Sequence, residues 1–124
     1  MLEILNTFSS FSVDDIDKAK NFYKSLGLRV EDDPMGIIEI YIGNLRILVY
    51  PKPNHQPATF TVLNFMVADI EKAVSVLKNK DIIPLQYPDL KTDKNGISRN
   101  DGPLIAWFKD PAGNILSVIE SKKN

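Results

Sequence analysis

An internal repeat divides the sequence into two halves of similar design. Residues 11–19 read Phe-Ser-Val-Asp-Asp-Ile-Asp-Lys-Ala and residues 65–73 read Phe-Met-Val-Ala-Asp-Ile-Glu-Lys-Ala, so that six of nine positions are identical. The copies begin 54 residues apart in a chain of 124 residues. A repeat of this length indicates one supersecondary unit per copy. We therefore expect a single domain over residues 1–124, made of modules 1–53 and 58–121.

Each copy has the pattern of a strand that leads into a helix. Asp15 and Asp69 are candidate N-caps, because a carboxylate there accepts backbone N–H groups and suits the positive end of the helix dipole. Gly27 is a natural C-terminal stop for the first helix. Apolar residues at helical spacing predict a core-facing stripe on both helices. These are Ile16, Ala19, Phe22, Tyr23 and Leu26 in the first helix and Ile70, Ala73, Val74 and Leu77 in the second.

After each helix the apolar pattern changes to a period of two, which predicts strands. Gly43-Asn44 is a typical two-residue hairpin turn, and Asp110-Pro111-Ala112-Gly113 is its counterpart in the second half. Proline residues 51, 53 and 57 indicate a linker between the halves, and the polar stretch 89–102 predicts a mobile loop and a candidate lid. The predicted strands are 39–42, 45–50, 104–109 and 114–119, with shorter ones near 28–31 and 83–86.

Pairing across the hairpins predicts which side chains share a face. With Ile42 opposite Leu45, Tyr41 lies opposite Arg46 and one face becomes wholly apolar, as expected under a helix. Similar pairing in the second hairpin places Trp107 beside Leu116, toward the helix. We call the opposite sheet face the far face. It is predicted to carry Phe8, Ser10, Ser12, Glu39, Tyr41, Arg46, Leu48, Tyr50, Val62, Asn64, Met66, Ile115, Ser117 and Ile119.

The far face mixes aromatic rings, small hydroxyls, an amide and one charge of each sign, which is typical of a pocket for a small organic ligand. The alternatives are a solvated sheet face and a face covered by a partner subunit.

The net charge of −1 favours neither nucleic acid nor an anionic membrane as a partner. The absence of cysteine excludes disulfides and thiolate chemistry. No secretory signal or membrane span is expected, which predicts a cytoplasmic protein.

Two segments resemble the vicinal oxygen chelate superfamily, which includes glyoxalase I, bleomycin resistance proteins, fosfomycin resistance proteins and extradiol dioxygenases. Residues 13–19 with Phe22-Tyr23 and Leu26-Gly27 resemble its opening, and residues 107–114 resemble its Asp-Pro-x-Gly hairpin. The resemblance covers essentially the whole chain. It implies an α+β fold of two βαβββ modules that form a cup-shaped mixed sheet, and it implies a homodimer.

Metal-using members of the superfamily place one metal ligand on the first strand of each module and another on its last strand. The matching positions here are Phe8, Leu48, Val62 and Ser117, and none is His, Glu or Asp. Hydrocarbon side chains and a neutral hydroxyl supply too few donors for a divalent cation, so we expect no metal and no other cofactor. This departure argues against glyoxalase I, fosfomycin-type and dioxygenase chemistry. His55, the lone histidine, is expected to be an exposed loop residue.

The sequence leaves three functions open. The first is a metal-independent binding protein whose cup sequesters an aromatic or amphipathic ligand. Its candidate ligand-binding residues are Phe8, Ser10, Glu39, Tyr41, Arg46, Leu48, Tyr50, Val62, Asn64, Met66, Phe108 and Ser117. The second is a metal-independent enzyme in which partial burial raises the pKa of Glu39 so that it acts as a general base, although an ion pair with Arg46 is favoured. The third is a structural or regulatory dimer whose cup is filled by its own side chains.

Overall fold

Two units, Met1–Pro57 and Ala58–Asn124, make up the computed structural model of the protein, which describes residues 1–100 and 102–121. We call them module 1 and module 2. The helices and strands of module 1 are β1 (Ser9–Val13), α1 (Ile16–Ser25), β2 (Arg29–Asp33), β3 (Ile37–Ile42) and β4 (Leu45–Pro51). Those of module 2 are β5 (Thr61–Val67), α2 (Ile70–Asn79), the 3₁₀ helix η1 (Pro88–Leu90), β6 (Ile97–Ser98), β7 (Ile105–Lys109) and β8 (Ile115–Glu120).

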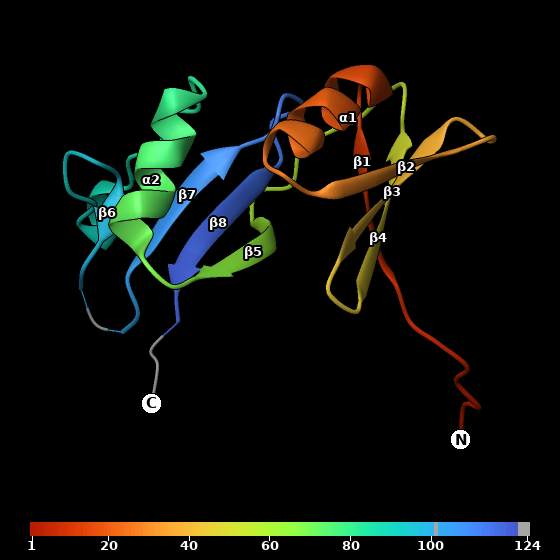
Figure 1. Cartoon of the computed structure of the whole chain (residues 1–124), viewed down its shortest axis with the longest axis horizontal. Helices are drawn as coiled ribbons and strands as arrows, with labels where there is room; N and C mark the ends of the chain where they lie inside the picture. The colour runs from red at the N-terminus through yellow and green to blue at the C-terminus, as the bar shows by residue number, and fades with distance from the viewer. Residues whose placement is uncertain (101, 122–124) are drawn as a thin grey trace. The chain divides into compact units, whose positions relative to one another are not determined.

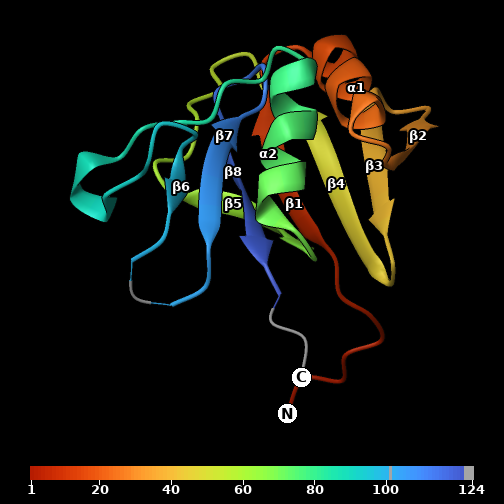
Figure 2. The ribbon, with the colours of Figure 1, turned by 60° about the vertical axis from the view of Figure 1, so that its left-hand side comes forward.

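The two modules have the same topology. Module 1 forms a four-stranded sheet in the order β1-β4-β3-β2, and module 2 forms one in the order β5-β8-β7-β6. In each sheet the first strand of the module runs parallel to the last, and the other pairs are antiparallel. Figures 1 and 2 show each helix against one face of its own sheet. The α+β fold with two βαβββ modules, which the family resemblance implied and the order of predicted strands and helices in each half indicated, is therefore confirmed.

Both helices begin at the predicted caps. The carboxylates of Asp15 and Asp69 accept the backbone N–H of Lys18 and Lys72 at 3.1 Å, three residues downstream. A carboxylate at this position satisfies one of the backbone donors that a helix start leaves without a partner. Gly27 follows α1 with φ of +88°, a conformation that glycine adopts without steric cost.

The register of the first hairpin places the apolar side chains under α1 as predicted. Ile42 lies opposite Leu45 and Tyr41 lies opposite Arg46. The alternate residues of β3 and β4 are buried, because every second side chain of a strand points to the same face. The core of module 1 contains Val13, Ala19, Tyr23, Val30, Ile38, Ile40, Ile47 and Val49.

The register of the second hairpin differs from the predicted one. Lys109 lies opposite Ile115, so that Phe108 faces Leu116 and Trp107 faces Ser117. Phe108 is 1% exposed and stacks on Phe65 with ring centroids 6.4 Å apart. The predicted helix-side position of Trp107 is wrong, and so is the predicted position of Phe108 on the far face.

The cause is the turn between β7 and β8, which holds five residues and not four. The Asp110 carboxylate accepts the N–H of Ala112 and of Asn114 at 3.0 and 2.9 Å. The backbone N–H of Asp110 in turn donates to the Asn114 carbonyl at 3.0 Å. Asn114 is thereby kept in the turn. Every residue of β8 therefore pairs with β7 one position away from the predicted partner.

The segment after α2 also differs from the prediction. Residues 83–86 are not a strand, although the Leu85 N–H donates to the Trp107 carbonyl at 2.8 Å. The short second strand of the module is β6, which lies inside the stretch 89–102 predicted as a mobile loop and candidate lid. Asp101, also in that stretch, lies outside the described residues. The α-helices in residues 1–100 and 102–121 have 10 residues each, about half the length that a membrane-spanning helix needs.

Candidate functional site

The far face of module 1 is built from side chains that alternate with the buried ones. Cross-strand partners share a face, and the register pairs Ser10 with Leu48 and Leu48 with Glu39. A second row pairs Arg29 with Tyr41 and Tyr41 with Arg46. The face of module 1 therefore consists of Ser10, Ser12, Arg29, Glu31, Glu39, Tyr41, Arg46, Leu48 and Tyr50.

Glu39 is the centre of a hydrogen-bond network on this face. Its Oε2 accepts from the Tyr41 hydroxyl at 2.6 Å, and its Oε1 accepts from Arg46 Nη2 at 2.6 Å and from Nε at 3.1 Å. The Glu39 side chain is 17% exposed and that of Arg46 is 39% exposed. The diagonal ion pair predicted from the hairpin is therefore present.

The network lowers the pKa of Glu39 below its ordinary value. The hydrogen bond from Tyr41 is the largest cause, the bond from Arg46 follows, and both outweigh the opposing effect of desolvation. The same bond to Glu39 raises the pKa of the Tyr41 hydroxyl. The expectation that partial burial raises the pKa of Glu39 is wrong. A carboxylate with a lowered pKa is a weaker base, and this argues against general-base catalysis by Glu39.

Two guanidinium groups lie over aromatic rings of module 1. The Arg29 guanidinium is 4.5 Å from the ring centroid of Tyr41, and that of Arg46 is 4.9 Å from the ring centroid of Phe8. Phe8 precedes β1 and is 52% exposed. Stacking and the bond to Glu39 together fix the orientation of Arg46. The far face of module 1 therefore carries aromatic rings beside a partly exposed ion pair.

His55 belongs to this face, which the sequence pattern did not indicate. Its Nδ1 lies 2.7 Å from the Ser12 hydroxyl in a hydrogen bond, and the residue is half-buried. The His55 N–H closes a turn on the Lys52 carbonyl at 3.0 Å. The prediction of an exposed loop residue is wrong. Pro53-Asn54 at the centre of the turn is a typical turn signal and could have indicated that the chain reverses there.

The far face of module 2 is more apolar. One row pairs Asn64 with Ser117 and Ser117 with Trp107. Ser117 is fully buried, and its hydroxyl donates to Asn64 Oδ1 at 2.5 Å. Tyr87 packs edge-on against Trp107, with ring centroids 5.1 Å apart. The next row consists of Met66, Ile119 and Ile105.

A shallow hollow of about 590 Å³ lies on this face of module 2. Met66, which is 73% exposed, forms one wall, and Asn64 supplies an amide beside it. The lining is mainly apolar. The hollow is lined by Asn64, Met66, Pro103, Ile119, Glu120 and Ser121.

The structure therefore divides the predicted ligand-binding residues between the modules. In module 1 it brings together Phe8, Arg46, Glu39 and Tyr41, and the register places Ser10, Leu48 and Tyr50 on the same face. In module 2, Asn64 and Met66 line the hollow. Ser117 is buried, and its hydroxyl is hydrogen-bonded to Asn64. Val62 lies where a register shift interrupts the β5–β8 pairing. Phe108 belongs to the core.

The positions that hold metal ligands in metal-using members of the superfamily do not offer a donor set here. Phe8 and Leu48 in module 1 and Val62 in module 2 present hydrocarbon side chains. The Ser117 hydroxyl is already bonded to Asn64. Over residues 1–100 and 102–121, no group of three or more His, Cys, Asp or Glu side chains is placed to hold a metal ion. These residues do not fit a divalent cation.

Several solved structures are similar to this chain over nearly its whole length. Lactoylglutathione lyase from Agrobacterium tumefaciens has a TM-score of 0.67 at 20% identity, covering 97% of this chain and 96% of that chain. The antibiotic binding protein TnmS3 from a Streptomyces species has a TM-score of 0.70 at 19% identity, covering 98% and 100%. The fosfomycin resistance protein FosX from Listeria monocytogenes has a TM-score of 0.72 at 14% identity, covering 98% and 96%. At such low identity the likeness shows the fold alone.

Sequence comparison gives the family. No curated protein matches the chain. Residues 5–118, which include both copies of the repeat, match the family described as the Glyoxalase/Bleomycin resistance protein/Dioxygenase superfamily. Because the match covers most of both modules, the chain belongs to the Glyoxalase/Bleomycin resistance protein/Dioxygenase superfamily.

Proposed function

We propose that this member of the superfamily is a metal-independent binding protein for an aromatic or amphipathic small molecule. The hollow on the far face of module 2 is the observation that carries the proposal. Its volume of about 590 Å³ falls in the range of roughly 300–1,000 Å³ usual for ligand pockets. Met66 and Ile119 offer apolar contact for the body of a ligand, and the Asn64 amide offers one hydrogen bond that orients it.

The far face of module 1 supports the same ligand class. Phe8 and Tyr41 present aromatic rings, and the guanidinium of Arg46 lies over the Phe8 ring, 4.9 Å from its centroid. Aromatic rings and planar guanidinium groups favour flat guests, because stacking adds to the free energy gained by burying apolar area. Arg46 also retains N–H groups that would meet an acidic or carbonyl oxygen of the ligand.

Metal independence is part of the proposal and is supported by the side chains at the ligand positions of metal-using members. Phe8, Leu48 and Val62 have no donor atoms, and the Ser117 hydroxyl is occupied by Asn64. Two of the similar structures are described as an antibiotic binding protein and a fosfomycin resistance protein. Those descriptions belong to those proteins, and they support a small organic compound as the ligand class. The cytoplasmic location stays a prediction.

The enzyme alternative, in which Glu39 is a general base, is not favoured. Its carboxylate is bonded to both Tyr41 and Arg46, and its pKa is lowered, first by Tyr41 and then by Arg46. The third alternative, a structural or regulatory dimer with a self-filled cup, makes a different prediction from ours, because its far faces would bind no added compound.

Fluorescence of Trp107 tests the proposal directly. Trp107 is the only tryptophan of the chain and lies on the far face of module 2 beside Ser117. Titration with a planar hydrophobic probe such as 1-aminoanthracene should change Trp107 emission in a saturable manner and raise the melting temperature.

A pair of variants locates the binding. Met66→Lys places a charge in the hollow and should weaken probe binding at least tenfold. Val76→Lys is the matched control, since Val76 is an apolar residue of α2 that is 45% exposed and lies outside the hollow. Zn²⁺, Ni²⁺ or EDTA should leave probe binding unchanged. Absence of saturable binding, equal loss in both variants, or loss of binding on chelation would each overturn the proposal.

A further inference from the structure

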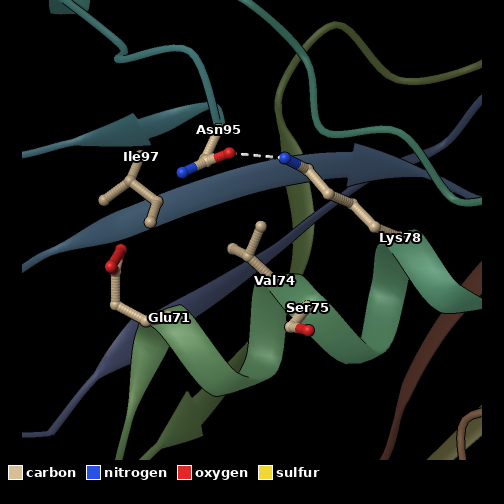
Figure 3. A pocket seen from close by; sticks show the side chains of 6 residues that line it. All are labelled: Glu71, Val74, Ser75, Lys78, Asn95 and Ile97. Atoms are coloured by element: carbon tan, nitrogen blue, oxygen red, sulfur yellow. Dashed lines mark hydrogen bonds between the residues drawn. The ribbon is translucent and has the colours of Figure 1, made fainter.

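A second hollow, of about 190 Å³, lies in module 2 between α2 and the segment that leads into β6. It is on the helix side of the sheet, whereas the hollow described above is on the far face. Figure 3 shows the six residues that line it. These are Glu71, Val74, Ser75, Lys78, Asn95 and Ile97.

The wall opposite α2 keeps its shape through its own hydrogen bonds. The Asp93 carboxylate accepts the N–H of Asn95 at 2.8 Å and the N–H of Ile97 at 3.0 Å. Gly96 has φ of +81°, and a Cβ there would lie 2.5 Å from the Pro84 Cβ. Only glycine fits at this point, so the turn at 93–97 is fixed without any ligand.

The floor of the hollow is apolar. The side chains of Val74 and Ile97 approach each other across it (Figure 3), and they are 3% and 0% exposed. They are fixed by the core of module 2, because Val74 lies on the buried stripe of α2 and Ile97 is in β6. Because both side chains are buried, the floor adds little contact area, but it offers no polar group that would compete for water beneath a short methylene chain.

The two ends of the hollow carry opposite charge. At one end the Lys78 ammonium donates to Asn95 Oδ1 at 2.5 Å (Figure 3), its only hydrogen-bond partner among the described residues. An ammonium has three N–H groups, so two remain for a ligand. At the other end Glu71 pairs with Arg99, and Arg99 also bonds Asp93 at 3.0 Å. The charges of Glu71, Asp93 and Arg99 sum to −1, because one guanidinium is shared by two carboxylates.

We propose that this hollow binds a linear zwitterion, an ω-amino carboxylate with a short methylene chain. Its carboxylate would meet Lys78 and Asn95, its ammonium would meet Glu71, and its chain would cross the hollow above Val74 and Ile97. Glu71 and Lys78 are seven residues apart on α2, roughly 10 Å along the helix axis. An α-amino acid carries both charges on one carbon and cannot reach both ends. The charged groups are partly solvated, so the expected dissociation constant is in the millimolar range.

Heteronuclear NMR of the full chain tests the proposal, because it detects weak binding and locates it. Titration with 5-aminopentanoate should shift the amide signals of Ser75, Asn95 and Ile97 along a saturable curve. Pentanoate lacks the ammonium and pentylamine lacks the carboxylate, so each should bind at least tenfold more weakly. Lys78→Met should abolish saturation. Lys72→Met, on the same helix but outside the hollow, should bind as the unaltered chain does.

The same spectra show whether each variant is folded. Three results would overturn the proposal: no saturable shift with 5-aminopentanoate at 50 mM or below, equal binding of pentanoate, or unchanged binding in folded Lys78→Met. Equal binding of pentanoate would reduce the hollow to a simple anion site. None of these results bears on the far-face hollow, because Trp107 and Met66 report on that hollow separately.

Discussion

At the scale of single residues, the environment of Glu39 decides what the far face of module 1 does chemically. The carboxylate accepts from Tyr41 and Arg46, and these bonds favour its charged form. The pKa of Glu39 is therefore lowered and its basicity is reduced. Glu39 is a residue that positions Arg46, and Arg46 in turn lies on Phe8.

The lowered pKa of Glu39 predicts how stability depends on pH. A group with a lowered pKa in the folded state stabilises the fold above its unfolded pKa, near the ordinary value of 4.5 for Glu. That contribution is lost as the pH falls through the lower folded pKa. Urea unfolding should show that the advantage of the unaltered chain over Glu39→Gln is constant from about pH 5 to 7 and declines below about pH 4.5.

Tyr41→Phe is the control for this prediction, because Tyr41 is the largest cause of the shift. The variant should raise the pKa of Glu39, as measured by NMR titration of its carboxyl carbon. If the stability difference between the unaltered chain and Glu39→Gln grew as the pH falls, the lowered pKa of Glu39 would be contradicted.

Phe108 gives a second prediction at this scale. It is 1% exposed and stacks on Phe65, so that Phe108→Ala removes a ring from the core. We expect the free energy of unfolding to fall by about 3–5 kcal/mol, measured by urea denaturation. Phe60→Ala is the matched control, since Phe60 is 67% exposed, and its effect should stay within about 0.5 kcal/mol. A folded Phe108→Ala with unaltered stability and lost probe binding would place Phe108 on the far face after all.

At the scale of elements, the start of α2 shows how local and distant groups cooperate. Asp69 accepts the N–H of Lys72 at 3.1 Å, and the Glu120 carboxylate from the end of β8 accepts the N–H of Ile70 at 3.0 Å. Two of the backbone donors at the helix start are thereby satisfied. The first contact is encoded locally, and the second requires that the sheet is already formed.

Asp69→Ala should lower the free energy of unfolding by about 1 kcal/mol, within the usual range for loss of an N-cap. The measurement is chemical denaturation at neutral pH. Asp14→Ala is the control, because Asp14 is exposed and lies next to the corresponding cap without being one. Equal effects of the two substitutions would mean that the loss of charge, and not the loss of the cap, sets the stability change.

At the scale of the whole molecule, the residues before β1 leave apolar surface exposed. Figures 1 and 2 show this segment leading away from the module 1 sheet, past the turn between β3 and β4. Leu2, Ile4 and Leu5 are 86%, 70% and 101% exposed. Exposure of several large apolar side chains in one segment favours association, because burying them is worth about 25 cal/mol per Å². We propose that the protein is a homodimer.

Sedimentation equilibrium should give twice the chain mass of 14.0 kDa. The triple substitution Leu2→Ser, Ile4→Ser and Leu5→Ser should shift the equilibrium toward the monomer. Val76→Ser is the control, because it removes a single exposed apolar side chain from α2. A monomeric unaltered chain at every concentration would contradict the proposal.

The sequence alone determined the features that rest on local pattern. The repeat indicated two halves of similar design, Asp15 and Asp69 indicated the helix starts, and the two-residue turn Gly43-Asn44 indicated the register of the first hairpin. Each depends on residues close together in the chain. Such patterns act through side-chain period and turn geometry, which the order of the residues contains directly.

Only the tertiary structure decided the features that depend on contacts between distant residues or on side-chain hydrogen bonds. Asp110 lengthens the second turn by one residue and thereby places Phe108 in the core and Trp107 on the far face. His55 meets Ser12, which lies 43 residues earlier in the chain. The lowered pKa of Glu39 requires two partners in place. The alternation of apolar and polar residues along a strand determines which side chains share a face. Which distant residue each side chain contacts is determined only when the chain is folded.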